Sequence, residues 1–243
     1  MTDCLAFALI AGLGMLVQST LGFAGSLVAV PLFALFLSPR DAVPAHCCLM
    51  LAVNLFLVCE GRRHVEWRAV RGLLVGGLPG VPIGVLALKH LPISFLGTAI
   101  SAVTLLFGLL FLSRVRVRFP VHPCTEPVVG LVSGILGGSI SESGPPVVVY
   151  ALARDWAKNV FRSSLLAYFL CLGLLAAASY VVLGMVRGYQ LQLAASGLLP
   201  AMAAAQLGVR LKQRIDEPTF RIAVLVTVIA VGIAGLLKYL LGQ

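Results

Sequence analysis

Charged residues are scarce in this chain. Aspartate, glutamate, lysine and arginine make up 11% of its 243 residues, whereas hydrophobic residues make up 60%. The mean hydropathy is +1.03. A soluble domain of this length needs far more polar surface, so a soluble fold is excluded. The sequence therefore predicts an all-α polytopic membrane protein in contact with the lipid bilayer.

Acidic residues are the scarcest of the charged ones. The chain has nine acidic and eighteen basic residues, which gives a net charge of +9. In a soluble protein this excess would suggest nucleic-acid binding. Here the basic residues form short clusters between apolar runs, as in cytoplasmic loops, so no nucleic-acid partner is expected.

Catalytic and metal-binding motifs are also lacking. The six cysteines follow no metal or disulfide spacing and are expected to be small core residues. The sequence has no Ser/His/Asp array, no pair of positioned carboxylates and no cluster of metal ligands. It is therefore predicted to be a non-enzyme without cofactor or metal, with an intramembrane enzyme as the less favoured alternative. The N-terminus lacks a basic region and a cleavage signature, so the first helix is expected to remain in the mature protein.

Apolar runs are abundant, and they fall into two halves of five. They cover residues 4–21, 26–37, 43–59, 70–88, 94–112, 127–137, 145–153, 160–184, 192–209 and 220–241. Residues 30–32 resemble 149–151, and 80–84 resemble 204–208, in the same order along the chain. These weak matches support a duplication, with residues 1–118 and 119–243 as two membrane repeats of one transmembrane domain.

One stretch, residues 134–150, is apolar at both ends but holds four glycines, two prolines and a glutamate. No uninterrupted membrane helix would combine these residues, so a helix broken at membrane depth is predicted. Pro145 and Pro146 suit the first turn of a new helix, which Ser141 or Ser143 is expected to cap. That helix would direct its free N–H groups at the gap, which favours an anion. A kink that only eases packing is the alternative.

The first long run is also interrupted, by residues 20–26. As one helix its 34 residues would extend about 51 Å, well beyond a hydrocarbon core of about 30 Å. It is therefore predicted to fold back as a hairpin. The segments 26–37, 127–137 and 145–153 are too short to span a membrane alone, as half-helices would be.

The loop charges distinguish two topologies. If each interrupted run crosses the membrane once, there are eight spans, and the eighteen basic residues divide nine to nine. If each run turns back, they divide fourteen to four, and cytoplasmic loops are enriched in Lys and Arg. Two inverted repeats with two glycine-rich re-entrant or broken helices are therefore predicted, with both termini on the non-cytoplasmic side. Secondary transporters build a midplane site from such repeats.

The two interruptions supply the predicted substrate-binding residues. They are Gln18, Ser19, Thr20, Gly22, Gly25 and Ser26 in the first, and Ser139, Ser141, Ser143, Gly144 and Pro145 in the second. Hydroxyls, amides and exposed backbone donors bind an oxyanion without a fixed cation. Each glycine alone equally suits close helix packing.

Glu142 lies inside the second interruption. A carboxylate at membrane depth needs a partner, a proton or a water-filled path, so Glu142 is predicted to couple transport to protons. A capping or hydrogen-bonding role is the open alternative. Arg162 is predicted to attract anions, with a salt bridge to Asp155 or an interfacial anchor as alternatives. The lone polar residues His46, Asn54 and Gln206 are expected to form interhelical hydrogen bonds.

Two glycine-rich motifs, at residues 21–32 and 143–150, resemble those of the TauE/SafE sulfite exporters and sulfonate permeases. Residues 64–68 leading to 80–84, and Phe161-Arg162, support the resemblance over essentially the whole chain. Where that family often has three consecutive glycines, this chain has residues 24–26, Ala-Gly-Ser, and residues 141–143, Ser-Glu-Ser.

The resemblance implies a secondary transporter of small sulfur-containing or carboxylated anions, without chemical conversion. An anion channel is the alternative. The expected location is a bacterial inner membrane, and the expected partner is a small anionic substrate. A co-transported proton and a homodimer are left open.

Overall fold

The computed structural model describes residues 2–21, 24–61, 64–113, 122, 124–154, 156–211 and 217–241. Within these ranges the regular structure consists of helices and contains no strand. The helices are α1 (Thr2–Leu21), α2 (Gly25–Phe36), α3 (Pro39–Gly61), α4 (Trp67–His90), α5 (Ile93–Leu112), α6 (Thr125–Ile140), α7 (Gly144–Ala153), α8 (Lys158–Val182), α9 (Gly188–Leu211) and α10 (Glu217–Leu240). The all-helical prediction is confirmed for this part of the chain.

Of the ten helices in the described ranges, seven have 20 to 25 residues, and α3 and α9 are among these seven. Among the described residues, five helices are long and apolar enough to cross a membrane: α1, α4, α5, α8 and α10. Three apolar helices are shorter, namely α2, α6 and α7. The short helices correspond to the segments that the sequence marks as too short to span.

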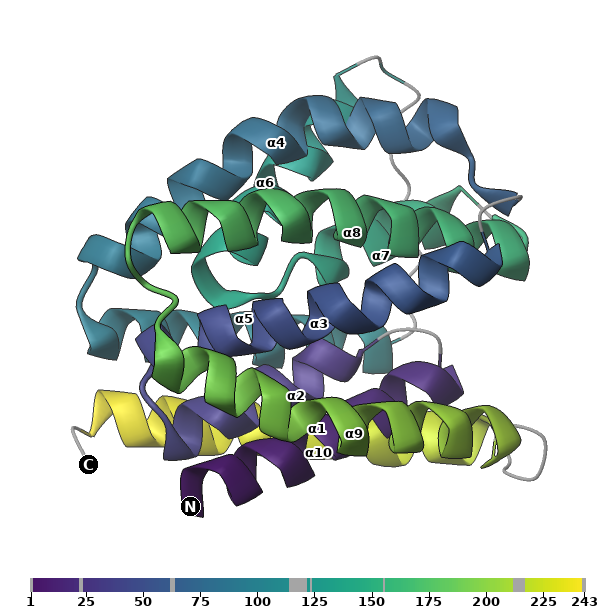
Figure 1. Ribbon diagram of the computed structural model, residues 1–243. Helices are drawn as coiled ribbons and strands as arrows, with labels where there is room; N and C mark the ends of the chain where they lie inside the picture. The colour runs from purple at the N-terminus through teal and green to yellow at the C-terminus, as the bar shows by residue number, and fades with distance from the viewer. Residues whose placement is uncertain are drawn as a thin grey trace.

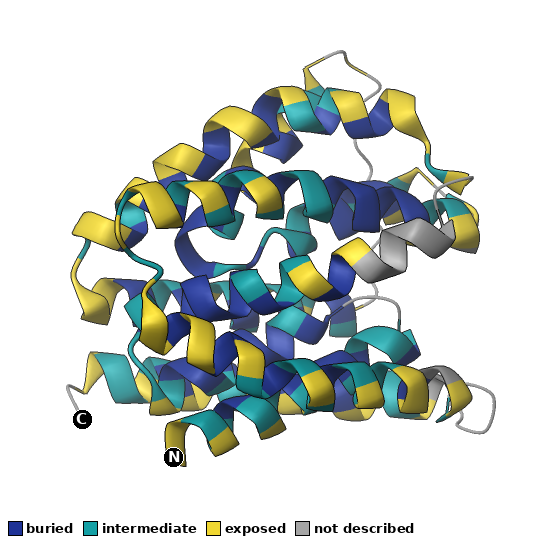
Figure 2. Ribbon diagram, in the orientation of Figure 1, coloured by how far each residue is buried: buried dark blue, intermediate teal, exposed yellow. Residues whose placement is uncertain are grey.

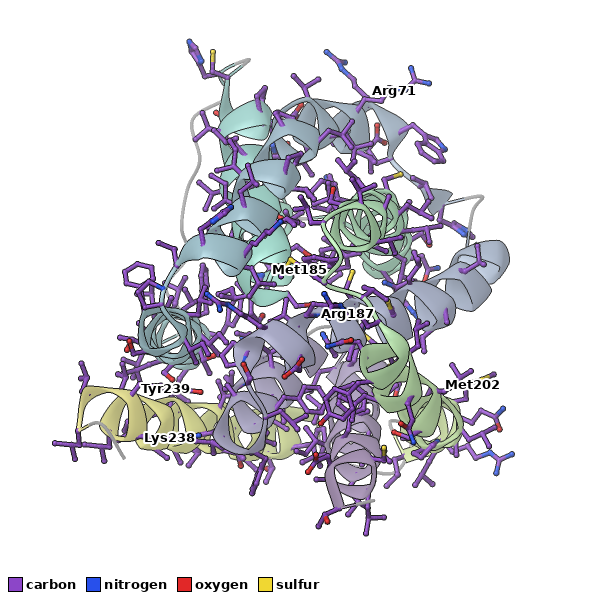
Figure 3. The ribbon with its side chains drawn as sticks, turned by 60° about the vertical axis from the view of Figure 1, so that its left-hand side comes forward. Arg71, Met185, Arg187, Met202, Lys238 and Tyr239 are labelled. Atoms are coloured by element: carbon purple, nitrogen blue, oxygen red, sulfur yellow. The ribbon has the colours of Figure 1, made fainter. Side chains whose placement is uncertain are left out.

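Helices of the two halves of the chain pack against each other. The closest partners are α4 with α6, α1 with α9, α5 with α10, and α3 with α8. In Figure 1 the long helices run across the picture and both termini lie toward the lower left, while the turned view of Figure 3 shows α10 running across the direction of α5 and α8. The two halves therefore share one interior.

The tightest of these contacts joins α4 and α6. Glycines recur every fourth residue on the facing surfaces: Gly76, Gly80 and Gly84 of α4, and Gly130, Gly134 and Gly138 of α6. A Cβ atom added at Gly80 would lie 2.5 Å from the carbonyl oxygen of Leu131. Membrane helices approach closely where residues are small. The short helix α6 is thus fixed along its length by α4.

Buried and exposed faces are clearly separated. Figure 2 shows buried residues on the helix faces that turn inward and exposed residues on the outer faces. The outer surface carries large apolar side chains such as Leu9, Val182 and Leu199, as a lipid-facing surface does. Cys47 is buried, but Cys124 is exposed, so the core prediction is wrong for Cys124.

The C-terminal end of α2 is held by α10. Lys238 Nζ donates hydrogen bonds to the carbonyl oxygens of Ala34 (3.2 Å) and Leu35 (2.8 Å). The Tyr239 hydroxyl also donates to Ala34, and Figure 3 shows both side chains on α10. A cation near a helix C-terminus stabilises it and satisfies carbonyls that lack helical partners.

Candidate functional site

The connections between α1 and α2 and between α6 and α7 come together inside the protein. We call residues 18–26, from the end of α1 to the start of α2, the first tip. Residues 139–145, from the end of α6 to the start of α7, are the second tip. Each tip contains a non-glycine residue in the left-handed conformation: Ala24 with φ 72° and Ser141 with φ 57°. Such a backbone costs about 1–2 kcal/mol for a residue with a side chain. Both tips therefore hold strained backbone.

The second tip begins α7 partly as predicted. Prolines occupy the first positions of α7, which confirms their expected place. Ser143 is the N-cap residue but makes no side-chain capping bond, and Ser141 Oγ pairs with His46 Nδ1, so the prediction that one of these serines caps α7 is wrong. The φ of −71° and ψ of −19° at Ser143 are already helical, whereas a capping side chain needs an extended backbone. The Ser143 carbonyl instead accepts a hydrogen bond of 2.6 Å from Ser133 Oγ.

Glu142 of the second tip forms a hydrogen bond to the first tip. Its side chain is fully buried, and Oε2 accepts a hydrogen bond of 3.1 Å from Ser26 Oγ of the first tip. Its other oxygen, Oε1, has no hydrogen-bond partner among the described residues. A buried, half-satisfied carboxylate is costly, which makes this position exceptional in the protein.

A cavity of about 510 Å³ lies beside the tips. Its wall includes nine of the predicted residues: Gln18, Ser19, Gly25, Ser26, Ser141, Ser143, Gly144, Pro145 and Arg162. The protein thus brings both interruptions of the chain, separated by more than a hundred residues in sequence, to one cavity.

Four of the predicted site residues do not line the cavity among the residues that the structure describes. Thr20 Oγ1 donates to the Leu16 carbonyl at 2.7 Å, and Ser139 Oγ donates to the Ile135 carbonyl at 2.7 Å. Hydroxyls within a helix often turn back to the carbonyl four residues earlier, which removes them from the gap. Glu142 is buried and does not line the cavity, and Gly22 falls outside the described residues.

The cavity also contains polar residues that the sequence did not assign to the site. These are His46 and Asn54 of α3, and Gln206 and Arg210 of α9. The interhelical hydrogen bond expected for His46 is present, since its Nδ1 lies 3.0 Å from Ser141 Oγ. Asn54 Oδ1 is buried without a partner in the described part of the chain. For His46, Asn54 and Gln206 the signal in the sequence is a polar residue inside an apolar run, whereas Arg210 follows such a run as a loop charge.

The cavity is positively charged at its mouth. Arg162, near the start of α8, and Arg210, at the end of α9, are both exposed and lie at the same end of the helices. Among the described lining residues there is no aspartate or glutamate. The inner wall combines serines and His46 with apolar residues such as Met50 and Phe169. Such a charge distribution attracts anions.

Comparison with known proteins gives the family. The sequence model described as "Sulfite exporter TauE/SafE" matches residues 5–235. The chain belongs to the TauE/SafE sulfite exporter family. The probable sulfite/organosulfonate exporter TauE of Cupriavidus necator is 30% identical over 167 residues. That match covers 65% of this chain and 64% of the relative, which is less than two thirds of the relative's length. No solved structure matches the chain.

In this TauE/SafE protein, the two glycine-rich motifs lie at the two tips. Residues 24–32 lead from the first tip into α2, and residues 143–150 lead from the second tip into α7. Phe161 and Arg162 lie in the first turn of α8, where Arg162 reaches the cavity. Part of each glycine-rich motif, together with Arg162, therefore lines the cavity.

Proposed function

We propose that this protein is a secondary transporter of a small sulfur-containing or organic anion, such as sulfite or a sulfonate, which works by alternating access around the two tips. One observation carries the proposal: polar residues from both tips line one cavity whose mouth bears Arg162 and Arg210. Neutral donors bind an anion strongly enough for recognition and weakly enough for release.

The packing of the helices supports inverted repeats. If residues 1–118 and 119–243 are exchanged, α1 takes the place of α6 and α4 takes the place of α9. The contact between α1 and α9 then corresponds to the contact between α6 and α4, and both contacts are present. The pairs α3/α8 and α5/α10 become themselves. Such an exchange of contacts is expected for two repeats related by a two-fold axis, which supports the proposal of a repeat architecture like that of many secondary transporters.

Access from one end favours a carrier over a channel. The lining residues come from the middle of α3, from the first part of α8 with Arg162, and from the C-terminal parts of α1 and α9, the latter with Arg210. Beyond the tips the interior is closed by apolar contacts such as the stacked rings of Phe7 and Phe33, whose centroids are 4.3 Å apart. We assign the open end to the cytoplasm of an inner membrane, with both termini outside, because the basic residues concentrate there.

The energy source depends on direction. A membrane potential, negative inside, assists the exit of an anion by about 2.3 kcal/mol per charge per 100 mV. Uptake needs a coupled ion, and Glu142 is our candidate for carrying a proton. Its burial beside Ser26, between the two tips, places it where a change of access would alter its surroundings.

The test uses purified full-length protein and a panel of sulfite, thiosulfate, sulfoacetate, taurine and small carboxylates. A ligand at 100 times its Kd stabilises the folded state by about 2.7 kcal/mol, which raises the melting temperature. We expect one or more anions to do so, and the same anions to show saturable counterflow in liposomes. An ohmic current would instead support a channel. If no anion binds or moves, the proposed function is wrong.

A further inference from the structure

His46 and Ser141 form a pair across the cavity wall. His46 comes from α3 in the first half of the chain, and Ser141 comes from the second tip. The His46 side chain is only 3% exposed, its Nδ1 lies 3.0 Å from Ser141 Oγ, and both residues line the cavity. The pair therefore connects the two halves of the chain at the inner wall.

Counting hydrogens shows what this pair offers to a ligand. A neutral imidazole has one N–H and one acceptor nitrogen, and a serine hydroxyl has one hydrogen. If Ser141 donates to Nδ1, the N–H of Nε2 remains. If Nδ1–H donates to Ser141, the serine hydrogen remains. In either tautomer the pair keeps one hydrogen that is not used in the shared bond.

The surrounding contacts fix the pair in place. Ser141, with φ 57°, is followed by Glu142, which is bonded to Ser26, and by Ser143, whose carbonyl is bonded to Ser133. Three consecutive residues are thus each held by a different helix: α3, α2 and α6. A donor that is fixed before binding loses little conformational entropy when the ligand arrives.

We propose that His46 and Ser141 act as one hydrogen-bond donor to an oxygen of the bound anion, which makes His46 a specificity-determining residue for oxyanions. This inference rests on the proposed function. The anion gains one directed hydrogen bond from this pair at the inner wall. Apart from His46, the described part of the wall has two basic residues, Arg162 and Arg210, and both lie at the mouth. Spherical anions such as chloride lack the several oxygens that such directed donors distinguish.

The experiment uses the full chain, labelled with 15N-histidine and titrated with methanesulfonate, whose charge is constant between pH 5 and 9. The chain has four histidines. His64, His90 and His122 are exposed and serve as internal controls. We expect the His46 resonances to shift in a saturable manner with methanesulfonate but not with chloride, while the control resonances stay unchanged.

Two variants measure the contribution of the pair. A hydrogen bond to a charged group contributes about 1.5–3 kcal/mol, so Ser141→Ala and His46→Phe should each weaken methanesulfonate binding about tenfold or more. The matched control His90→Gln, at an exposed position, should bind like the parent.

Two outcomes would overturn the proposal in different ways. If methanesulfonate binds while the His46 resonances stay unchanged, His46 does not contact the anion, and the proposed function still stands. If neither methanesulfonate nor any anion of the panel binds the parent protein, both this inference and the proposed function fail. The labelled parent protein decides the first case without depending on the folding of a variant.

Discussion

The two tips share a cavity but are held in place differently. In the first tip, the hydroxyls of Ser19 and Thr20 bond to carbonyls of their own helix, α1. In the second tip, each of the three residues 141–143 is bonded to a residue outside the tip. In the first tip, Ser19 and Thr20 are therefore supported by their own helix, and among the described residues only Ser26 is bonded to the second tip. All three residues 141–143 of the second tip are instead bonded to residues outside it.

The bases of the two hairpins repeat this contrast. At the base of the second hairpin, Tyr150 donates a hydrogen bond of 2.7 Å to Glu126, and Arg154 lies 3.6 Å from the same carboxylate. These contacts join the end of α7 to the start of α6 directly. The end of α2 is instead held by α10. We expect the second hairpin to move as one rigid unit and the first to follow the helices around it.

The largest effect on transport is expected from a change at Glu142, which is bonded to Ser26 of the first tip. Glu142→Gln keeps an oxygen that accepts the hydrogen bond from Ser26 but cannot release a proton. If Glu142 carries the coupled proton, the variant should lose accumulation driven by a pH gradient and should keep counterflow of substrate. Uptake into liposomes with and without a pH gradient measures both.

A matched control for this variant is Glu126→Gln, because Glu126 is a carboxylate of the same helix pair that lies outside the tips. Its pH-gradient dependence should match the parent's. Should Glu142→Gln also keep the parent's rate and pH dependence, the coupling role is eliminated and a structural role is left.

The next largest effect compares the stability lost when a bond from α6 to the second tip is removed with the stability lost when a bond within α1 is removed. Ser133 is fully buried, and Ser133→Ala removes the bond that holds Ser143. An unsatisfied carbonyl costs about 1–3 kcal/mol when buried, and Ser143 is half-buried, so the cost should lie near the lower end, about 1 kcal/mol. Ser19→Ala removes only a bond to carbonyls within α1, so its cost should stay below about 0.5 kcal/mol. Melting in detergent compares the two, and equal losses would refute the contrast.

A smaller effect should come from relieving backbone strain. Ala24→Gly should stabilise the protein by about 0.5–1 kcal/mol, because relief of about 1–2 kcal/mol exceeds the added entropy of the unfolded chain. At Ser141 the same change to glycine also removes the bond to His46, so the net change should be close to zero. A lower melting temperature for Ala24→Gly would show that the strain argument is wrong.

The smallest effect is expected at the base of the second hairpin. The side chains of Arg154 and Glu126 are 33% and 26% exposed, and partly exposed ion pairs contribute only about 0–1 kcal/mol. Arg154→Gln should therefore lower stability by less than about 1 kcal/mol, provided that Tyr150 keeps its bond to Glu126. Thermal melting in low and high salt measures this, and a larger loss would make the ion pair a main support of the hairpin.

The helices and their breaks follow from local sequence. Each predicted apolar run corresponds to one helix, because hydrophobic length and the positions of glycine and proline are local properties. The break before α7 was readable from Gly144, Pro145 and Pro146, since two prolines cannot continue a helix but can begin one.

The composition of the cavity wall was only partly readable. Thr20 and Ser139 belong to the right segments, but their hydroxyls turn back onto the helix, and this depends on the rotation of each helix about its axis. Arg210 counted only as a loop charge in the sequence. It reaches the cavity because α9 packs against α1, a contact between residues far apart in the chain.

By itself the sequence determined that the described part of this protein consists of apolar helices, and that polar residues occupy the connections between α1 and α2 and between α6 and α7. Hydrophobicity and backbone chemistry act over a few residues, so they can be read locally. Only the tertiary structure decided that His46 pairs with Ser141, that Ser26 meets Glu142, and that two arginines share one cavity mouth. These contacts depend on how the helices pack, and packing is a property of the whole chain.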